Sequence, residues 1–161
     1  MNQELERVAQ AIGLQDDDPL RLAFAAACIA RVQHLLEEPR TIELAAVLRD
    51  AAAAGASLAS LSGAADEAAR LARSHRGHAS IDGSGHSAVS ATHALANALA
   101  GKALAAADYA AYAATYAYGR YAAGDPGAFE PEFQWQVECL QRLHQERTTH
   151  AAAHRDRRLL G

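Results

Sequence analysis

The sequence is poor in the residues that build β-sheets. Only 6% of its 161 residues are aromatic, and valine, isoleucine and threonine are few. Sandwiches and barrels depend on these residue types, because branched and aromatic side chains pack best on a pleated surface. The composition therefore argues against a β-sandwich or a β-barrel.

Lysine and cysteine are scarce as well. Lys102 is the only lysine and the net charge is −4, so the chain has no general excess of positive charge with which to neutralise phosphates. We therefore expect no nucleic acid among its partners. The two cysteines, Cys28 and Cys139, form no Cys-x-x-Cys pair and lie in apolar helical patterns. Buried, reduced thiols are the simplest interpretation.

Long apolar runs and a leader-like start are also missing. The longest uncharged stretch, residues 83–101, is rich in serine, alanine and glycine and is too polar to span a bilayer. The first seven residues carry several charges and lack the apolar core of a signal peptide. We expect a cytoplasmic protein that makes no contact with a membrane.

Alanine, in contrast, makes up about a quarter of the chain, far above ordinary usage. It is the best helix former, and its small side chain lets helices lie close together. Alanines cluster in residues 23–30, 51–72 and 88–123 and are absent from residues 129–150. The sequence predicts an all-α fold: a compact bundle of six or seven helices with a central Ala-rich helix pair, clasped by a final helix.

Capping residues and apolar spacing mark the expected helices. Asp18 and Thr41 are expected to cap helices and Pro39 to end one, while the glycine-rich residues 74–87 predict a loop. We expect a single helical domain over residues 1–149 and a flexible C-terminal tail over residues 150–161, where the helical pattern decays. The expected helices cover residues 2–12, 18–38, 41–55, 64–74, 87–101 and 102–123, with a last one that begins at Glu130.

Eight histidines make a metal site an alternative to consider. Two arrangements are conceivable: a cluster within the predicted loop, and one histidine from each of three helices inside the bundle. The loop cluster would use His75, His78, Asp82 and His86, and the bundle cluster would use His34, His93 and His144. The loop spacing matches no established ligand pattern, and we expect no metal and no cofactor.

The sequence also lacks the common signatures of catalysis. It holds no Gly-x-Ser-x-Gly, no Walker loop and no dinucleotide-binding fingerprint. We therefore expect no catalytic residues. A small helical-bundle enzyme with a His-ligated metal is the alternative.

Two acidic groups and two tyrosines are the candidates for binding a partner. Asp16 and Asp17 precede one expected helix and Glu37 and Glu38 lie at its far end, and either group could dock a basic partner. The two tyrosines, Tyr118 and Tyr121, flank Arg120 near the end of another helix and are candidates for an interface.

Three further tyrosines share one helix face. Tyr109, Tyr112 and Tyr116 fall at spacings i, i+3 and i+7, and we interpret them as packing residues that fill the gaps left by alanine, with a recognition surface as the alternative. Trp135 is expected to anchor the final helix in the core. Helix faces rich in alanine and tyrosine also suit a homodimer, so a self-associating helical module remains open.

Three segments of the chain share features with a known family. They are residues 26–32 (AACIARV) with 35–39 (LLEEP), residues 91–98 (ATHALANA) with 107–114 (ADYAAYAA), and residues 132–136 (EFQWQ). These segments resemble the immunity-five-like family of bacterial immunity proteins, which are encoded beside polymorphic toxins.

The most specific parts of this resemblance are His93 and the Trp135–Gln136 pair. Asn97 stands where the family usually has a second histidine, four residues after the first. The resemblance implies a non-enzymatic inhibitor that binds a cognate protein toxin tightly and blocks it.

Overall fold

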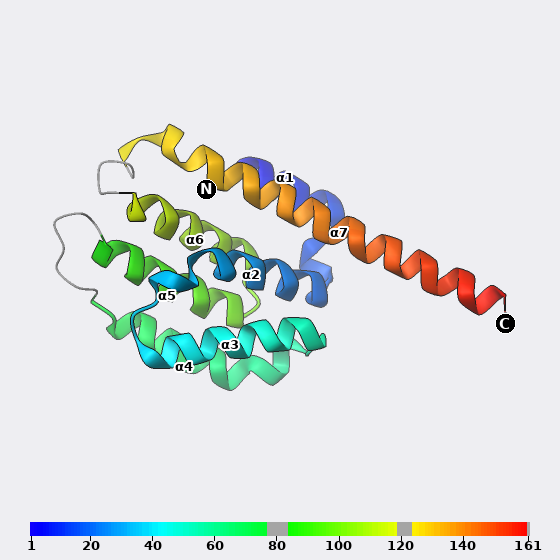
Figure 1. Ribbon diagram of the computed structural model, residues 1–161, viewed down its shortest axis with the longest axis horizontal. Coiled ribbons are helices and arrows are strands. Elements are labelled where there is room, and N and C mark those ends of the chain that lie inside the picture. Colours follow the sequence, from blue (N-terminus) through cyan, green and yellow to red (C-terminus); the bar gives the residue numbers. More distant parts are fainter. Residues whose placement is uncertain (77–83, 119–123, 161) are drawn as a thin grey trace.

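The computed structural model describes residues 1–76, 84–118 and 124–160 (Figure 1). Within these ranges the chain forms seven α-helices and several short 3₁₀ turns, and no strand. This confirms the predicted all-α bundle. The helices are α1 (Gln3–Ile12), α2 (Asp18–Val32), α3 (Pro39–Ala54), α4 (Ser62–Ser74), α5 (Ser84–Leu99), α6 (Ala103–Ala117) and α7 (Glu130–Leu159).

The Ala-rich helices α5 and α6 pack against each other at the centre of the bundle, and α2 packs on both (Figure 1). Helices α1 and α7 cover one side of this centre, while α3 and α4 cover the other. Many of the side chains between these helices are alanines with no exposed surface, so the helix backbones lie close together. They include Ala94, Ala98, Ala106, Ala107 and Ala113.

Two glycines directly follow helices. Gly13 follows α1 with a φ of 70°, and Gly55 follows α3 with a φ of 64°. Both angles lie in the left-handed region, which glycine enters without steric cost.

The boundary between α2 and α3 differs from the prediction. Asp17, not Asp18, caps α2, because its Oδ1 accepts the amide hydrogen of Leu20 at 2.9 Å. Helix α2 ends at Val32 and is followed by a 3₁₀ turn. Pro39 begins α3 rather than ending α2, since a proline in the first turn of a helix loses no hydrogen bond.

Thr41 is likewise not a cap. Its hydroxyl donates a 2.6 Å hydrogen bond to the carbonyl oxygen of Glu38, inside the first turn of α3. The side chain is buried there, although its sequence position suggested the start of a helix.

Helix α7 runs well beyond the body of the bundle (Figure 1). Residues 150–159, where the sequence predicts a loss of helical pattern, continue α7 instead. Alanine and arginine are strong helix formers, which accounts for the continued helix. All of these residues are exposed. No helix within the described ranges is long and apolar enough to cross a lipid bilayer.

Candidate functional site

Aromatic and imidazole rings gather on the outer side of the α5–α6 pair. Tyr109 and Tyr112 are 40% and 39% exposed, whereas the alanines on the opposite face of α6 are buried. Both rings are therefore partly covered at the edge of the bundle, and both remain accessible to a partner. We refer to His86, His93, Tyr109, Tyr112, Tyr116 and Phe129 as the aromatic face.

The rings of the aromatic face hold one another in place. His93 of α5 stacks on Tyr109 of α6 with a centroid separation of 5.2 Å and an interplanar angle of 21°. Near the other end of α6, the ring of His86 lies 5.3 Å from that of Tyr116. Such ring pairs stabilise the observed orientations and restrict the motion of the exposed tyrosines.

The aromatic face extends to the start of α7. Tyr112 meets Phe129 edge to face at 5.0 Å, and Phe129 lies 5.7 Å from Phe133. A hollow of about 320 Å³ opens beside these rings. It is lined by Met1, Tyr112, Gly124, Pro126, Phe129 and Phe133. The face therefore combines partly exposed rings with an adjoining apolar depression.

His93 also borders a groove between α4 and α5, with a volume of about 300 Å³. The polar residues that line the groove are Asp66, Arg73, His93, Asn97 and Lys102, and the others are alanines. Asn97, from the family-like segment, donates a 2.9 Å hydrogen bond from Nδ2 to the carbonyl oxygen of His93. His93 thus connects the aromatic face to a polar groove.

Burial lowers the pKa of His93 below its usual range, and the nearby imidazole of His75 lowers it further. The folded protein therefore resists protonation of His93, while the unfolded chain takes up the proton at the ordinary pKa. His93 consequently reduces stability as the pH falls through the pKa of the unfolded chain.

We expect the variant His93→Gln to lose less stability than the wild type between about pH 7 and pH 5, because glutamine takes up no proton. Thermal unfolding of both proteins at several pH values measures this difference. The matched control is His150→Gln, which removes an exposed histidine on α7. A pH dependence in His93→Gln as steep as in the wild type would contradict the assignment.

The other family-like residues lie on α7, away from His93. Trp135 is half-buried against the core, and the guanidinium carbon of Arg31 lies 4.2 Å from the centre of its ring. Arg31 also donates two hydrogen bonds to Glu132, at 3.0 and 2.5 Å. These contacts fasten α2 to α7, so Trp135 serves the packing of the bundle.

Gln136 is 1% exposed and connects three helices. Its Nε2 donates to the carbonyl oxygen of Ala107 at 2.7 Å, and its Oε1 accepts from Nδ2 of Asn2 at 3.2 Å. Asn2 in turn caps α1 by accepting the amide hydrogen of Leu5. The Trp135–Gln136 pair is therefore structural and does not join His93 in one site.

The structure does not bring the two acidic groups together. Asp16 and Asp17 precede α2, whereas Glu37 and Glu38 follow it, so the length of α2 separates them. Asp17 also accepts a hydrogen bond from Arg147 of α7 at 3.2 Å. Glu37 lies 3.4 Å from Nε2 of His75, and Glu38 is exposed at the start of α3.

The two predicted interface tyrosines have different outcomes. Tyr118 is 76% exposed directly after α6, in agreement with an accessible position. Tyr121 lies outside the described residues.

The three histidines of the bundle arrangement do not come together in the described part of the chain. Within residues 1–76, 84–118 and 124–160, no group of three or more His, Cys, Asp or Glu side chains is arranged to hold a metal ion. His34 is exposed and His93 stacks on Tyr109, so His34, His93 and His144 do not meet inside the bundle. His78 and Asp82 lie outside the described residues.

Comparisons with known proteins find no significant match among protein-family models, curated proteins or solved structures. Sequence reasoning placed the tyrosines of α6 on one face but missed their contacts with His86, His93 and Phe129. The signal for the shared face is that these tyrosines recur among alanines at helical spacing. A helix that packs closely through alanine turns its large residues outward.

Proposed function

We propose that the protein is a non-catalytic binding protein that neutralises a cognate protein toxin in the cytoplasm. The exposed aromatic face on α5 and α6 supports this proposal most strongly. The resemblance of three segments to immunity proteins supplies the class of partner.

The physical properties of the aromatic face suit a protein interface. Tyrosine offers a large contact area at a low cost in side-chain entropy, and it is enriched among the residues that dominate binding energies. The stacks of Tyr109 on His93 and of Tyr116 on His86 already restrict these rings. A partner therefore loses little free energy in ordering the surface that it binds.

The charge of the chain suits a basic toxin surface. The net charge is −4, and Asp16, Glu37 and Glu38 are exposed at the two ends of α2. Complementary charge accelerates the encounter between two proteins more than it tightens their complex. We assign the acidic groups to steering and the aromatic face, with Tyr118 after the same helix, to affinity.

The test uses the C-terminal domain of the protein encoded immediately upstream of this chain. We expect this domain to arrest the growth of a bacterial host, and co-expression of the wild-type chain to restore growth. The double variant Tyr109→Ala/Tyr112→Ala should fail to restore it and should bind the purified domain at least about 100-fold more weakly, as is typical when two central aromatic residues are removed.

The matched control is Ile42→Ala, which removes an apolar side chain that is 53% exposed on α3, away from the aromatic face. Circular dichroism establishes that both variants are folded. The proposal is wrong if the upstream domain neither arrests growth nor binds the chain. If the double variant protects as well as the wild type, toxin binding does not use the aromatic face.

A further inference from the structure

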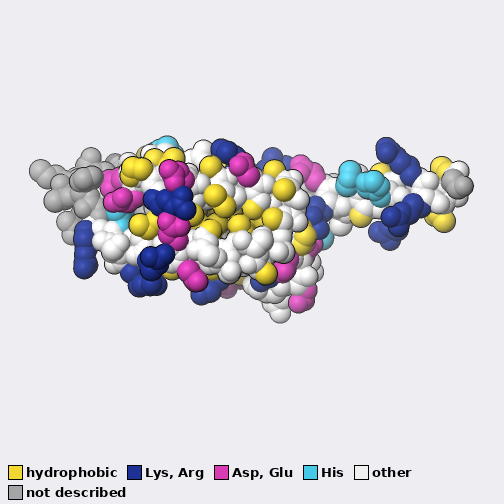
Figure 2. Space-filling model, turned by 90° about the horizontal axis from the view of Figure 1, so that it is seen from below, with side chains coloured by type: hydrophobic (Ala, Val, Ile, Leu, Met, Phe, Trp, Pro, Cys, Tyr) yellow, Lys and Arg dark blue, Asp and Glu magenta, His cyan; other side chains and the backbone are white. Residues whose placement is uncertain are grey.

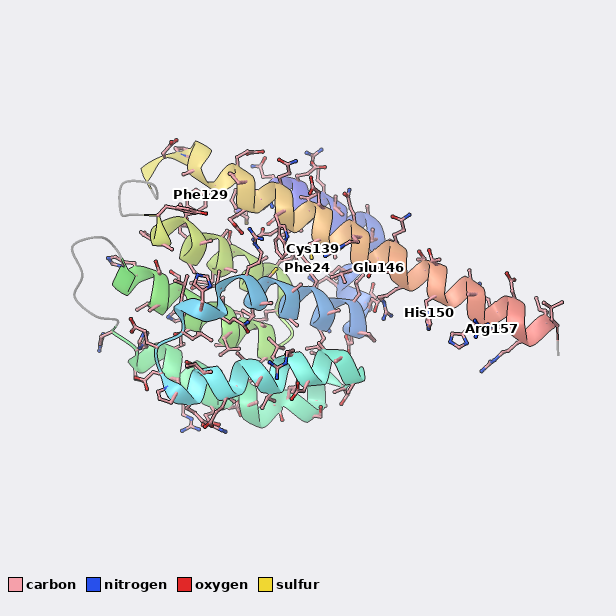
Figure 3. The ribbon with its side chains drawn as sticks, in the orientation of Figure 1. Phe24, Phe129, Cys139, Glu146, His150 and Arg157 are labelled. Carbon is pink, nitrogen blue, oxygen red and sulfur yellow. The ribbon has the colours of Figure 1, made fainter. Side chains whose placement is uncertain are left out.

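The last half of α7 forms a projecting arm, which we define as residues 145–160. The last side chains of α7 that pack on the core belong to Cys139, Leu140 and Leu143, and every residue of the arm is exposed. At a rise of 1.5 Å per residue, the arm is about 24 Å long. Figure 3 shows Glu146, His150 and Arg157 along the part that extends away from the bundle.

Alanine and arginine sustain the arm as a continuation of α7, but no residue of the arm is buried against the body. The tip of the arm exposes two apolar side chains, Leu159 and Leu160, at 84% and 90%. Exposed apolar side chains at the end of an uncovered helix suit a surface that binds another molecule.

The arm and the body differ in charge. The arm contains four arginines and two carboxylates, so the rest of the chain is more acidic than the overall charge of −4. Histidine and arginine side chains dominate the projecting part (Figure 2). The acidic body of this chain is thus complementary in charge to the arm.

A narrow uncharged stripe runs along the arm between Arg155 and Asp156. Arg147, His150, His154 and Arg157 follow one another at helical spacing, and the rings of His150 and His154 are 4.8 Å apart. Thr148, Ala152 and Leu159 fall on the opposite side of the helix. The consecutive alanines 151–153 allow another helix to approach closely at the middle of the arm.

An acidic group lies at the base of the arm. Arg147 donates a hydrogen bond to Asp17 at 3.2 Å, which places residues 16–18 beside the first turn of the arm. Asp16 and Asp18 are exposed there, and Asp18 also pairs with Arg21.

We propose that a second copy of this chain covers the arm, through an antiparallel pair of arms related by a twofold axis at Ala152. In this register, residue 155 of one arm lies at the same height along the helix pair as residue 149 of the other arm. Residue 158 likewise lies at the height of residue 146. Arg155 and Arg158 of each copy then reach the acidic residues 16–18 at the base of the partner's arm. The uncharged stripes face each other, and Leu159 is covered.

In a twofold-symmetric pair the same surface patch of each copy contacts the partner, so every contact occurs twice. Two arms alone bury an area at the low end of the range for specific interfaces, so the dimer is expected to dissociate in the micromolar range. Association should weaken as salt screens the arginine–aspartate contacts.

Sedimentation equilibrium between about 1 and 200 µM tests this dimer, a range chosen for micromolar dissociation. The expected mass rises from 17.0 kDa to twice that value with concentration. Arg155→Glu/Arg158→Glu and Asp16→Arg/Asp18→Arg should each weaken the dimer by at least about tenfold, because like charges would then face each other.

Mixing the two charge variants should restore a dimer. In the mixed pair, the acidic side chains introduced at positions 155 and 158 of one copy face the basic side chains introduced at positions 16 and 18 of the other, and the second contact keeps its native charges. The matched control, Arg70→Glu, reverses an exposed arginine on α4 and should leave dimerisation unchanged. A wild-type chain that stays monomeric at the highest concentration overturns the proposal. A dimer that is indifferent to both charge variants overturns it as well.

A cysteine at the twofold axis tests the register. Under oxidation by diamide, Ala152→Cys should form a disulfide between two copies, because the symmetric positions meet there. Thr149→Cys, on another side of the arm, should form much less. The native Cys28 and Cys139 are 1% and 2% exposed, and burial raises the pKa of both thiols, so they should not compete. Equal crosslinking at both positions would reject the proposed pairing.

Discussion

Replacing Gln136 with alanine is expected to lower the free energy of unfolding by about 3 kcal/mol. The side chain is 1% exposed, and its removal leaves a cavity at the meeting point of α1, α6 and α7. It also removes the hydrogen bonds with Ala107 and Asn2. Because Asn2 caps α1, the first helix should loosen together with the contact between α6 and α7.

Two further variants separate the contributions to this loss. Gln136→Leu restores most of the volume but not the hydrogen bonds, and we expect it to cost about 1–2 kcal/mol. The matched control is Gln134→Ala on the same helix. Gln134 is exposed and bonds only to Glu138 among the contacts seen, so its removal should change stability by less than about 0.5 kcal/mol. Urea denaturation of the three variants and the wild type gives the free energies of unfolding.

If Gln136→Ala were no more destabilising than Gln134→Ala, the buried network would contribute nothing to stability. If Gln136→Leu were as destabilising as Gln136→Ala, the hydrogen bonds would account for the whole effect and the cavity for none of it. The comparison therefore separates the contribution of the hydrogen bonds from that of the filled volume.

Much of the fold follows from local signals in the sequence. Gly13 and Gly55 end helices because few other residues adopt their backbone angles, and Glu130 begins α7 as expected. Local signals fail where neighbours compete. Asp17 and Asp18 are equally good caps by type, and only the bond to Leu20 distinguishes them. Pro39 fits both the end of one helix and the start of the next.

Contacts between distant residues could not be predicted in this way. Asn2 and Gln136 meet across almost the whole length of the chain, and nothing in either local sequence identifies the other. The same holds for Arg31 above the ring of Trp135. The stack of His93 on Tyr109 was accessible in principle, since both residues stand on adjacent Ala-rich helices. Recognising it required knowing that the alanine faces pack inward and the tyrosines outward.

In the arm, the sequence pattern led to a different error, because a helix forms where none was expected. Residues 150–159 lack an apolar stripe, and this absence predicted the end of the helical pattern. An apolar stripe reports packing, however, while helix formation also depends on intrinsic propensity. Ala151, Ala152 and Ala153, followed by arginines, favour the helix even where the body offers no surface to cover it.

Replacing Ala106 with leucine is expected to destabilise the protein by about 3 kcal/mol, the upper part of the range for overpacked cores. Ala106 has no exposed surface and lies on α6, which packs on α2 and α5 at the centre of the bundle. The added carbons have no space unless these helices move apart, and that movement would disturb the close contacts of the neighbouring alanines.

This variant distinguishes two reasons for the abundance of alanine. Leucine is almost as good a helix former as alanine, so a helix chosen only for its propensity would tolerate the change. A helix chosen for close packing would not. The matched control, Ala53→Leu on the exposed side of α3, should stay within about 0.5 kcal/mol of the wild type. Equal stabilities of the two variants in urea denaturation would show that alanine serves helix formation alone, whereas the expected gap assigns it to the spacing of the central helices.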